Sequence, residues 1–174
     1  MRDLAARSGM SLAGLYHHFA SKAQLLYALE VDAFERLFAS LSGMPADGPP
    51  EVRLEFLIRN HLEFFTAHIV EMKVLSHELE TLQGEPGRKI VAMRAEYYRL
   101  CRDVVAELLA AEGRTDLDSR VTTMTIFGMI NWIYRWYGSV PAMKADELAA
   151  QMSSIVLHGI LKSNNRGSKR IENG

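Results

Sequence analysis

Cysteine is nearly absent from this sequence of 174 residues, which contains Cys101 alone. A single thiol cannot form an internal disulfide, and no CxxC or Cys/His cluster is present to suggest a structural zinc site. Such cysteine usage is typical of proteins that work in a reducing compartment. We therefore expect a cytoplasmic protein whose chain is long enough to bury its own hydrophobic core.

Long hydrophobic runs are lacking as well. The N-terminus, MRDLAARSGM, has charged residues where a signal peptide would need its apolar segment. The most apolar stretch, Met124 to Tyr137, is too short to span a bilayer and contains Asn131 and Arg135. We therefore expect a soluble protein with no membrane partner.

The chain has no large excess of charge of either sign, because 20 basic and 21 acidic residues give a formal net charge of -1. A global basic field is therefore missing, but DNA binding requires only a local basic patch. Common enzyme motifs are missing too, since there is no GxSxG, no glycine-rich phosphate loop and no HExxH. We expect no enzymatic activity, no catalytic residue and no cofactor.

Strand signals are also absent, because no run alternates residues rich in Val, Ile and Thr. Five prolines divide the chain into helix-length pieces whose apolar residues recur every three to four positions. The sequence therefore predicts an all-α fold of about nine helices. The longer helices are expected over residues 21–41, 51–67, 71–82, 87–111, from the 113–116 loop to about 137, and over 145–161.

The first 22 residues contain a more specific pattern. Ala5 is small where two helices would cross, Gly9 tolerates the positive φ of a tight turn, and Leu15 faces back into the first helix. These residue types at this spacing describe a helix-turn-helix, with Ser11 as the N-cap of its recognition helix. Ser21 is expected to open the following helix, with capping-box spacing.

The run LYHHFASKAQLL closely resembles the signature of the tetracycline-repressor (TetR) family of regulators, in which an aromatic residue, a Phe and a Lys recur after the recognition helix. Here these residues are Tyr16, Phe19 and Lys22. Residues 127–138 and 146–161 resemble the last two helices of the family. The domains expected on this basis are a helix-turn-helix domain with its connecting helix over 1–41, a ligand-binding and dimerisation domain over 42–163, and a disordered tail over 164–174.

The resemblance implies a role in DNA binding for several residues of the motif. Ser11 caps the recognition helix and reaches a phosphate, Tyr16 offers its hydroxyl to a backbone phosphate, and Lys22 supplies a cation near exposed helix N–H groups. For His17 the alternative is a solvated histidine at a helix end. The residues expected on the side that enters the major groove are Ala13, Gly14 and His17.

In the TetR family a full helix precedes this motif, whereas the present sequence begins inside the expected second helix. Two functions are therefore open. The first is a ligand-responsive transcriptional regulator, expected to be a repressor, that binds operator DNA as a homodimer and is released by a small hydrophobic effector. The alternative is a ligand-binding, dimeric helical protein that has lost DNA binding through N-terminal truncation, and a salt-dependent gel shift would separate the two.

The last two helices are expected to form the dimer interface. Small residues there let helices approach closely, and apolar residues supply the area to bury, as in a four-helix bundle between two subunits. The alternative is that this face is buried within the monomer. The residues predicted at the interface are Gly128, Met152, Ile155, Val156, Gly159 and Ile160.

A small-molecule cavity is expected between these helices and the middle ones, because aromatic, methionine and a few polar residues are combined there. Ordinary core packing is the alternative for each of them. His61 and His68 share a helical face, but without an i, i+4 histidine pair no metal site is expected. The residues predicted to line the cavity are Phe64, Phe65, Met72, Met93, Tyr97, Met124, Phe127, Asn131, Trp132 and Arg135.

The stretch NWIYRWY resembles family members that regulate lipid or steroid breakdown in response to acyl-coenzyme A thioesters. The expected effector is therefore an elongated hydrophobic molecule such as an acyl-coenzyme A. One or more arginines of the middle helices are expected to meet its anionic head group, with solvated surface charge as the alternative. These arginines are Arg59, Arg94, Arg99 and Arg102.

Overall fold

The computed structural model describes residues 11–77, 81–139 and 143–158. Within these ranges the chain forms helices and their connections without any β-strand, so the predicted all-α fold is confirmed. The α-helices are α2 (Leu12–His18), α3 (Lys22–Ser40), α4 (Pro50–Ala67), α5 (Ile69–His77), α6 (Gly84–Ala111), α7 (Ser119–Asn131) and α8 (Ala145–His158). Three short 3₁₀ helices complete them, η1 (Leu41–Gly43), η2 (Trp132–Arg135) and η3 (Tyr137–Ser139).

Several helix ends agree with the sequence prediction. Ser21 is the N-cap of α3, and its Oγ accepts a hydrogen bond from the Gln24 N–H at 3.1 Å. The Gln24 side chain in return accepts from the Ala20 N–H, one residue before the capping-box position. The helix predicted over residues 2–8, the end of the last helix at 161 and the tail lie outside the described residues.

Two helix starts differ from the prediction. Helix α5 begins at Ile69 instead of Glu71, and α6 begins at Gly84 instead of Gly87. Pro86 does not delay α6, because the first turn of a helix needs no backbone donors. A Cβ at Gly87 would collide with the Leu82 carbonyl oxygen, so glycine lets the preceding chain fold back onto this first turn.

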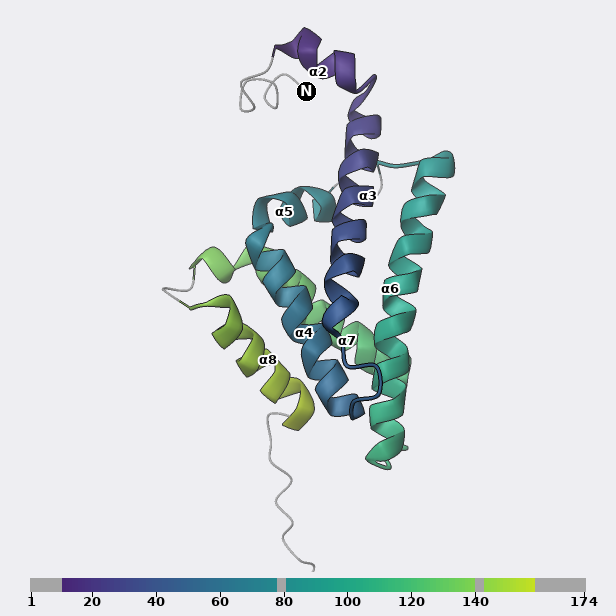
Figure 1. The fold of residues 1–174 in the computed structure, drawn as a ribbon, viewed down its shortest axis with the longest axis vertical. Helices are drawn as coiled ribbons and strands as arrows, with labels where there is room; N and C mark the ends of the chain where they lie inside the picture. The colour runs from purple at the N-terminus through teal and green to yellow at the C-terminus, as the bar shows by residue number, and fades with distance from the viewer. Residues whose placement is uncertain (1–10, 78–80, 140–142, 159–174) are drawn as a thin grey trace, which may run out of the picture.

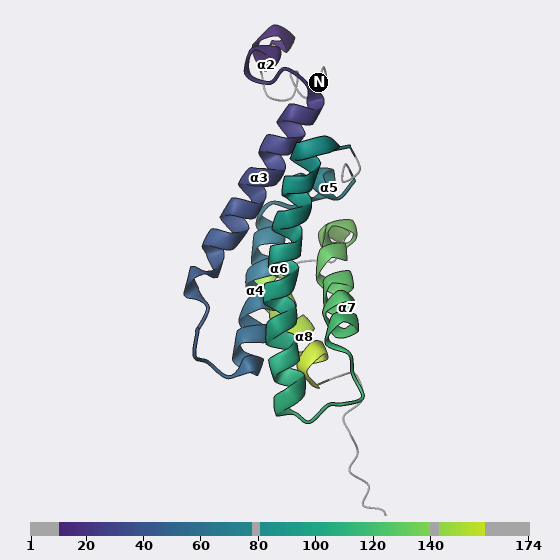
Figure 2. The same cartoon turned by 90° about the vertical axis from the view of Figure 1, so that its right-hand side faces the viewer.

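Helix α4 lies in the middle of the body, with α8 along one side and α6 and α7 on the other (Figure 1). Ile58, Leu62 and Ile133 are almost completely buried where these helices meet. Figure 2 shows α6 between α3 and α7, so that α6 connects the two sides of the bundle. None of the described helices combines the length and apolar character that crossing a bilayer requires.

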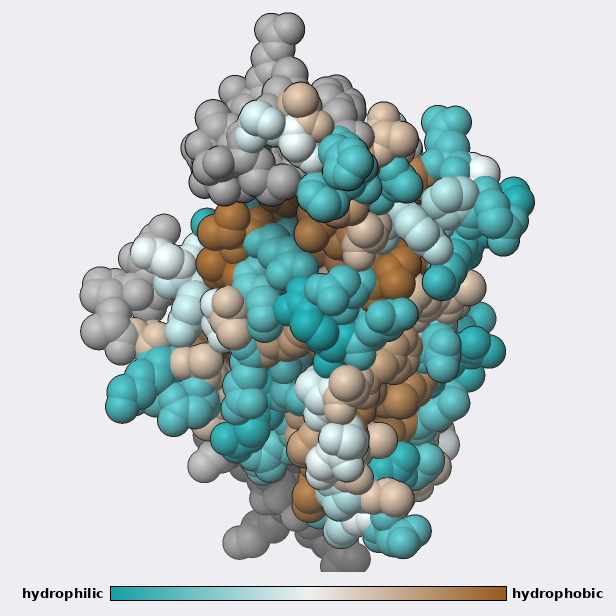
Figure 3. Space-filling view, turned by 45° about the horizontal axis from the view of Figure 1, so that its top comes forward, coloured by the Kyte–Doolittle hydropathy of each residue, from teal (hydrophilic) through white to brown (hydrophobic). Residues whose placement is uncertain are grey.

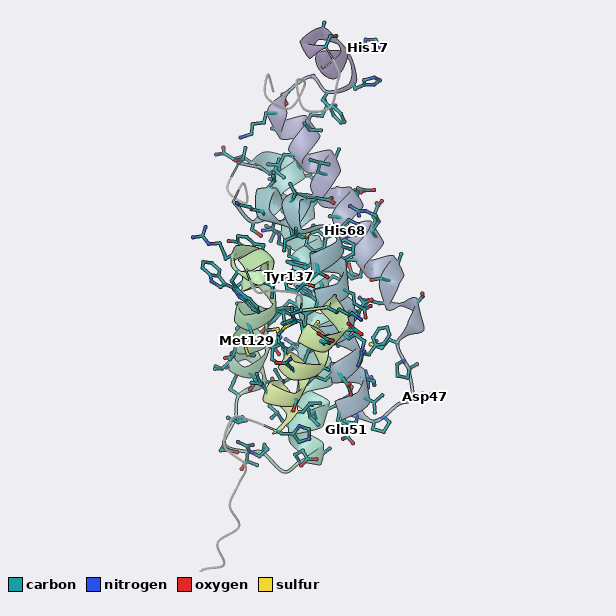
Figure 4. The ribbon with its side chains drawn as sticks, turned by 90° about the vertical axis from the view of Figure 1, so that its left-hand side faces the viewer. His17, Asp47, Glu51, His68, Met129 and Tyr137 are labelled. Atoms are coloured by element: carbon teal, nitrogen blue, oxygen red, sulfur yellow. The ribbon has the colours of Figure 1, made fainter. Side chains whose placement is uncertain are left out.

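Helix α3 connects the body to α2, which lies at one end of the molecule (Figures 1 and 2). Figure 4 shows His17 of α2 at this end, and Asp47 and Glu51 toward the opposite end. The inner side of α3 buries Leu26, Glu30, Ala33 and Leu37 against the body. A displacement of α3 against the body would therefore move α2 directly.

Candidate functional site

The recognition helix α2 has the cap that the sequence predicts. The Ser11 Oγ accepts a hydrogen bond from the Gly14 N–H at 2.9 Å, which occupies one of the free donors of the first turn. Ala13 and His17 are exposed, and their spacing of four places them on one face of α2. Lys22 is exposed at the start of α3, whereas the side chain of Tyr16 lies outside the described part of the structure.

A cavity of about 690 Å³ lies between α3, α4, α5, α6, α7 and η2. Its volume is within the range of small-molecule sites, which is about 300 to 1,000 Å³. Eight of the ten residues predicted to line a cavity do so, namely Phe64, Phe65, Met72, Tyr97, Met124, Phe127, Asn131 and Trp132. The cavity therefore lies between α7 and the middle helices as predicted, whereas α8, predicted as another of its boundaries, contributes no lining residue over Ala145–His158.

Met93 and Arg135 were predicted in the lining but are not among the residues that form it. The Arg135 guanidinium instead lies 5.4 Å from the centre of the Trp132 ring. The prediction assumed a continuous α-helix to about residue 137, whereas η2 is a 3₁₀ helix. Because each residue of a 3₁₀ helix turns by about 120° instead of about 100°, Arg135 rotates away from the face that contains Asn131.

Helix α3 contributes a wall of the cavity that the sequence reasoning missed. Glu30, Ala33, Phe34 and Leu37 all line it, at the i, i+3, i+4 and i+7 spacing of one helix face. The signal was present in the sequence, because Glu30 interrupts the apolar stripe of this helix with a charge. A buried carboxylate in such a stripe requires a partner.

His61 is buried and forms a polar cluster with Tyr97 and Asn131 at the cavity wall. The His61 Nε2 lies 2.9 Å from the Asn131 Oδ1, and the Nδ1 lies 3.2 Å from the Tyr97 hydroxyl. One tautomer satisfies both contacts, with the Nε2–H donating to Asn131 and Tyr97 donating to the Nδ1. Burial lowers the pKa of His61 to about 3, so the ring is neutral near pH 7.

The histidines considered as metal ligands have other partners. Both ring nitrogens of His61 are within hydrogen-bond distance of Tyr97 and Asn131, and the His68 Nδ1 lies 2.8 Å from the Phe64 carbonyl oxygen. Within the described ranges, no group of three or more His, Cys, Asp or Glu residues could hold a metal ion.

An ion pair between α3 and α6 forms the charged part of the cavity wall. The Arg94 Nη2 lies 2.9 Å and 3.1 Å from the two Glu30 carboxylate oxygens. Glu30 is 2% exposed, while the Arg94 side chain is 33% exposed. Burial raises the pKa of the Glu30 carboxyl, and the charge of Arg94 opposes this shift. This pair therefore joins the cavity to the helix that follows the recognition helix.

The other three arginines predicted at the cavity mouth lie elsewhere. None of them is among the lining residues, and each uses its side chain in a local contact on its own helix. The contacts are Arg59 with Glu55 at 3.2 Å, Arg102 with Asp103 at 2.8 Å, and Arg99 with the Ala95 carbonyl oxygen at 3.3 Å.

A second ion pair holds α3 to the body outside the cavity lining. The Arg36 Nη2 lies 2.7 Å from the Glu71 Oε1 of α5, and its guanidinium lies 5.4 Å from the centre of the Phe64 ring. Neither Arg36 nor Glu71 lines the cavity. Of these two ion pairs between α3 and the body, a ligand in the cavity could contact the first and not the second.

The residues predicted at a dimer interface differ in their environment within one chain. Met152 is buried against the core, Val156 is half-buried, and Ile155 is 43% exposed on α8. Gly128 is exposed on α7 and also lines the cavity. Gly159 and Ile160 lie outside the described residues. Part of the α8 face is thus buried within the monomer, and Ile155 remains on the outside.

Apolar side chains also remain exposed elsewhere on the single chain. Val121, Met124 and Trp132 are more than half exposed on one side of α7 and η2. Figure 3 shows hydrophobic side chains at the surface below the N-terminal end, with hydrophilic side chains between them. These surfaces are available to a second chain or to a ligand.

Two family models match the chain. The model described as "Bacterial regulatory proteins, tetR family" matches residues 1–29, and the model described as "Tetracyclin repressor-like, C-terminal domain" matches residues 47–160. The first match ends within α3, and the second begins before α4. The second match alone covers more than half of the chain.

Relatives of this chain include transcriptional regulators. The HTH-type transcriptional repressor KstR2 of Mycobacterium tuberculosis is 28% identical over 166 residues, which are 93% of this chain and 82% of the relative. The structure of this KstR2 superposes with a TM-score of 0.80 and 26% identity, covering 91% of this chain and 82% of the other. AibR in complex with isovaleryl coenzyme A and operator DNA gives a TM-score of 0.76 and 27% identity, covering 88% and 84%.

These relatives match across both parts of the chain, so the alternative of a protein without a DNA-binding function is not favoured. In the described structure, α3 follows the capped recognition helix and also lines a cavity of the size that small ligands need. The chain belongs to the tetR family of bacterial regulatory proteins, and it is a ligand-responsive transcriptional regulator and not an enzyme.

Proposed function

We propose that this protein is a repressor that binds operator DNA as a homodimer and is released by an elongated hydrophobic effector, an acyl-coenzyme A thioester. The observation that supports this most directly is the cavity wall formed by Ala33, Phe34 and Leu37 of α3. An effector in this cavity contacts the same helix that connects to the recognition helix, so binding and DNA recognition are coupled through α3.

The chemistry of the cavity fits an acyl chain with a polar end. Its walls are mainly aromatic and aliphatic, and the methionines Met72 and Met124 can repack around chains of different shape. The Asn131 side-chain amide, whose oxygen accepts a hydrogen bond from the neutral His61 ring, has its N–H groups left to donate to a thioester carbonyl, and no charge has to be desolvated. The complex of the similar AibR with isovaleryl coenzyme A supports the same ligand class.

DNA binding is proposed to use residues 1–41, with residues 42–163 binding the ligand and the partner subunit. Ala13, Gly14 and His17 would enter the major groove, while Ser11, Tyr16 and Lys22 would contact phosphates. The two recognition helices of a dimer must match successive major grooves about 34 Å apart. A ligand that displaces α3 would change this separation and release the DNA.

Titration with acyl-coenzyme A compounds tests this function. We expect isovaleryl-, decanoyl- or palmitoyl-coenzyme A to raise the melting temperature, because a ligand that binds only the folded state stabilises it. The same compound should weaken binding to a DNA duplex selected from a random pool. No stabilisation at any chain length, together with stabilisation by a planar aromatic compound, would contradict the proposed ligand class.

Gly128 provides a direct test of the cavity as the ligand site. Apart from its chain neighbours and the backbone of its own helix, a Cβ at this position would have no described atom within 4 Å, so a larger side chain can enter the cavity without colliding with another helix. Gly128→Trp should weaken decanoyl-coenzyme A binding by on the order of tenfold or more, because each methylene excluded from the cavity loses about 0.8 kcal/mol. Isothermal titration calorimetry measures this loss.

Gly128→Ala is the matched control. It should leave decanoyl-coenzyme A affinity nearly unchanged and increase the free energy of unfolding by about 0.5 to 1 kcal/mol, because alanine favours the helix over glycine. If Gly128→Trp binds decanoyl-coenzyme A as tightly as the alanine variant, the ligand lies outside this cavity.

A further inference from the structure

We propose that Arg94 is the anion-binding residue of the cavity, and that its ion pair with Glu30 weakens when an acidic ligand binds. A charge on the ligand is thereby detected as a weakening of the ion pair between α6 and α3. This inference rests on the proposed ligand site and adds to it the charge of the ligand and the residue pair that detects this charge.

Among the described residues that line the cavity, the charged ones are Glu30 and Arg94. The rest of the lining is apolar or neutral, including His61, whose pKa is far below 7. An acidic group that enters this cavity therefore meets a single positive charge, that of Arg94. In a mainly apolar cavity a charge without a partner is costly, so Arg94 determines where an acidic group is placed.

The geometry of the pair leaves Arg94 able to bind a second anion. A guanidinium has five N–H donors, and the hydrogen bonds recorded for Arg94 among the described residues all use Nη2. The groups Nε and Nη1 therefore remain for a carboxylate or phosphate oxygen. Both residues line the cavity, and because the Arg94 side chain is one-third exposed while Glu30 is 2% exposed, an incoming anion has access to the arginine.

Sharing Arg94 between two anions weakens its contact with Glu30. The Glu30 carboxylate is buried, and burial already raises its pKa, so it depends on the arginine for its charge. A ligand anion beside Arg94 removes part of this compensation and also repels Glu30. Glu30 lies on α3, so the strain acts on the helix that connects to the recognition helix.

Two kinds of ligand could supply the anion. Both have a negatively charged oxygen group at one end of a hydrophobic chain. One source is a carboxylate on the hydrophobic ligand itself, and the other is a phosphate of a coenzyme A group. Decanoate and decanoyl-coenzyme A represent these two sources with the same chain. Decanol supplies the chain without any charge.

The test compares the affinities of these three compounds for the wild-type protein and for Glu30→Gln by isothermal titration calorimetry. Glutamine keeps a hydrogen-bond acceptor for Arg94 but removes the competing charge, so at least one acidic compound should bind about tenfold tighter. Decanol affinity should stay the same. A gain for decanoate alone identifies a carboxylate as the ligand anion, and a gain for decanoyl-coenzyme A alone identifies a phosphate.

Two further variants separate a charge effect from a general loosening of α3. Glu71→Gln removes the charge of the other ion pair of α3, outside the cavity, and should leave the preference for acidic compounds over decanol unchanged. The double variant Glu30→Gln/Arg94→Met should lose that preference, because the binding cation is gone. Both variants are measured with the same three compounds.

The inference is overturned if Glu30→Gln leaves the ratio of acidic-compound to decanol affinity at its wild-type value, or if Glu71→Gln changes this ratio equally. In these cases the proposed hydrophobic ligand site remains, because the compounds still bind. If none of the three compounds binds the wild-type protein, both the inference and the proposed ligand class are wrong.

Discussion

Replacing Arg94 by methionine should reduce the free energy of unfolding by about 3 to 5 kcal/mol near neutral pH, because it leaves Glu30 as a buried carboxylate without its partner. Methionine has a length similar to that of arginine, so the change removes the charge while keeping most of the packing. Urea unfolding followed by circular dichroism measures the difference between the variant and the wild-type protein.

The loss should depend on pH in a defined direction. Burial raises the pKa of the Glu30 carboxyl, and removal of Arg94 takes away the charge that opposes this shift. A carboxyl whose pKa is higher in the folded than in the unfolded state destabilises the fold above its unfolded pKa, and this cost disappears as the pH falls below that value. The deficit of Arg94→Met should therefore be largest at about pH 7 to 8 and much smaller at about pH 5.

Two controls check the physical reason for this loss. The double variant Arg94→Met/Glu30→Gln should recover most of the stability and lose the pH dependence, since no carboxyl remains at the site. Arg36→Met breaks the ion pair with Glu71, which is more exposed, and should cost about 1 kcal/mol or less. An Arg94→Met deficit that is the same at both pH values would contradict the assignment to Glu30.

Replacing Ile155 by glutamate should convert the dimer into monomers and weaken operator binding by on the order of a hundredfold or more. Ile155 is 43% exposed on the outer side of α8, so glutamate is tolerated in a single chain but is costly when a second subunit covers it. The loss of DNA affinity follows because two recognition helices that are no longer joined bind their half-sites independently. Light scattering after gel filtration gives the mass, and fluorescence anisotropy gives the affinity.

Val91→Glu is the matched control for this prediction. Val91 is 65% exposed on α6, which is not one of the two helices proposed to form the interface, so the same charge there should leave the dimer intact. If Ile155→Glu keeps the mass of the dimer, the interface does not include the outer side of α8.

Much of the fold follows from local sequence patterns. The Ser11 and Ser21 side chains cap α2 and α3 as predicted, because a capping residue and the backbone N–H that it accepts are only three positions apart. Eight of the residues that line the cavity were predicted for a similar reason. Aromatic and methionine residues at helical spacing on α4, α6 and α7 indicate helix faces that are buried against other helices. In this structure those faces surround a cavity.

The residues that were missed depend on contacts between distant parts of the chain. Glu30 and Arg94 are separated by 64 positions, so no local pattern reveals that they form a pair. His61 was considered as a metal ligand, but its neighbours Tyr97 and Asn131 come from two later helices. Helix packing decides these partnerships, and a single sequence contains no direct record of it.

The double use of α3 has a consequence for how such regulators can diversify. Ala33, Phe34 and Leu37 shape the cavity and also belong to the helix that sets the position of the DNA-binding end. A substitution there alters ligand preference and operator response together, so evolution can rarely change one without disturbing the other. Substitutions in the walls from α4, α6 and α7 escape this conflict, except at Arg94, which pairs with Glu30 of α3. New ligand specificities should therefore accumulate in those three helices, while the inner face of α3 changes slowly.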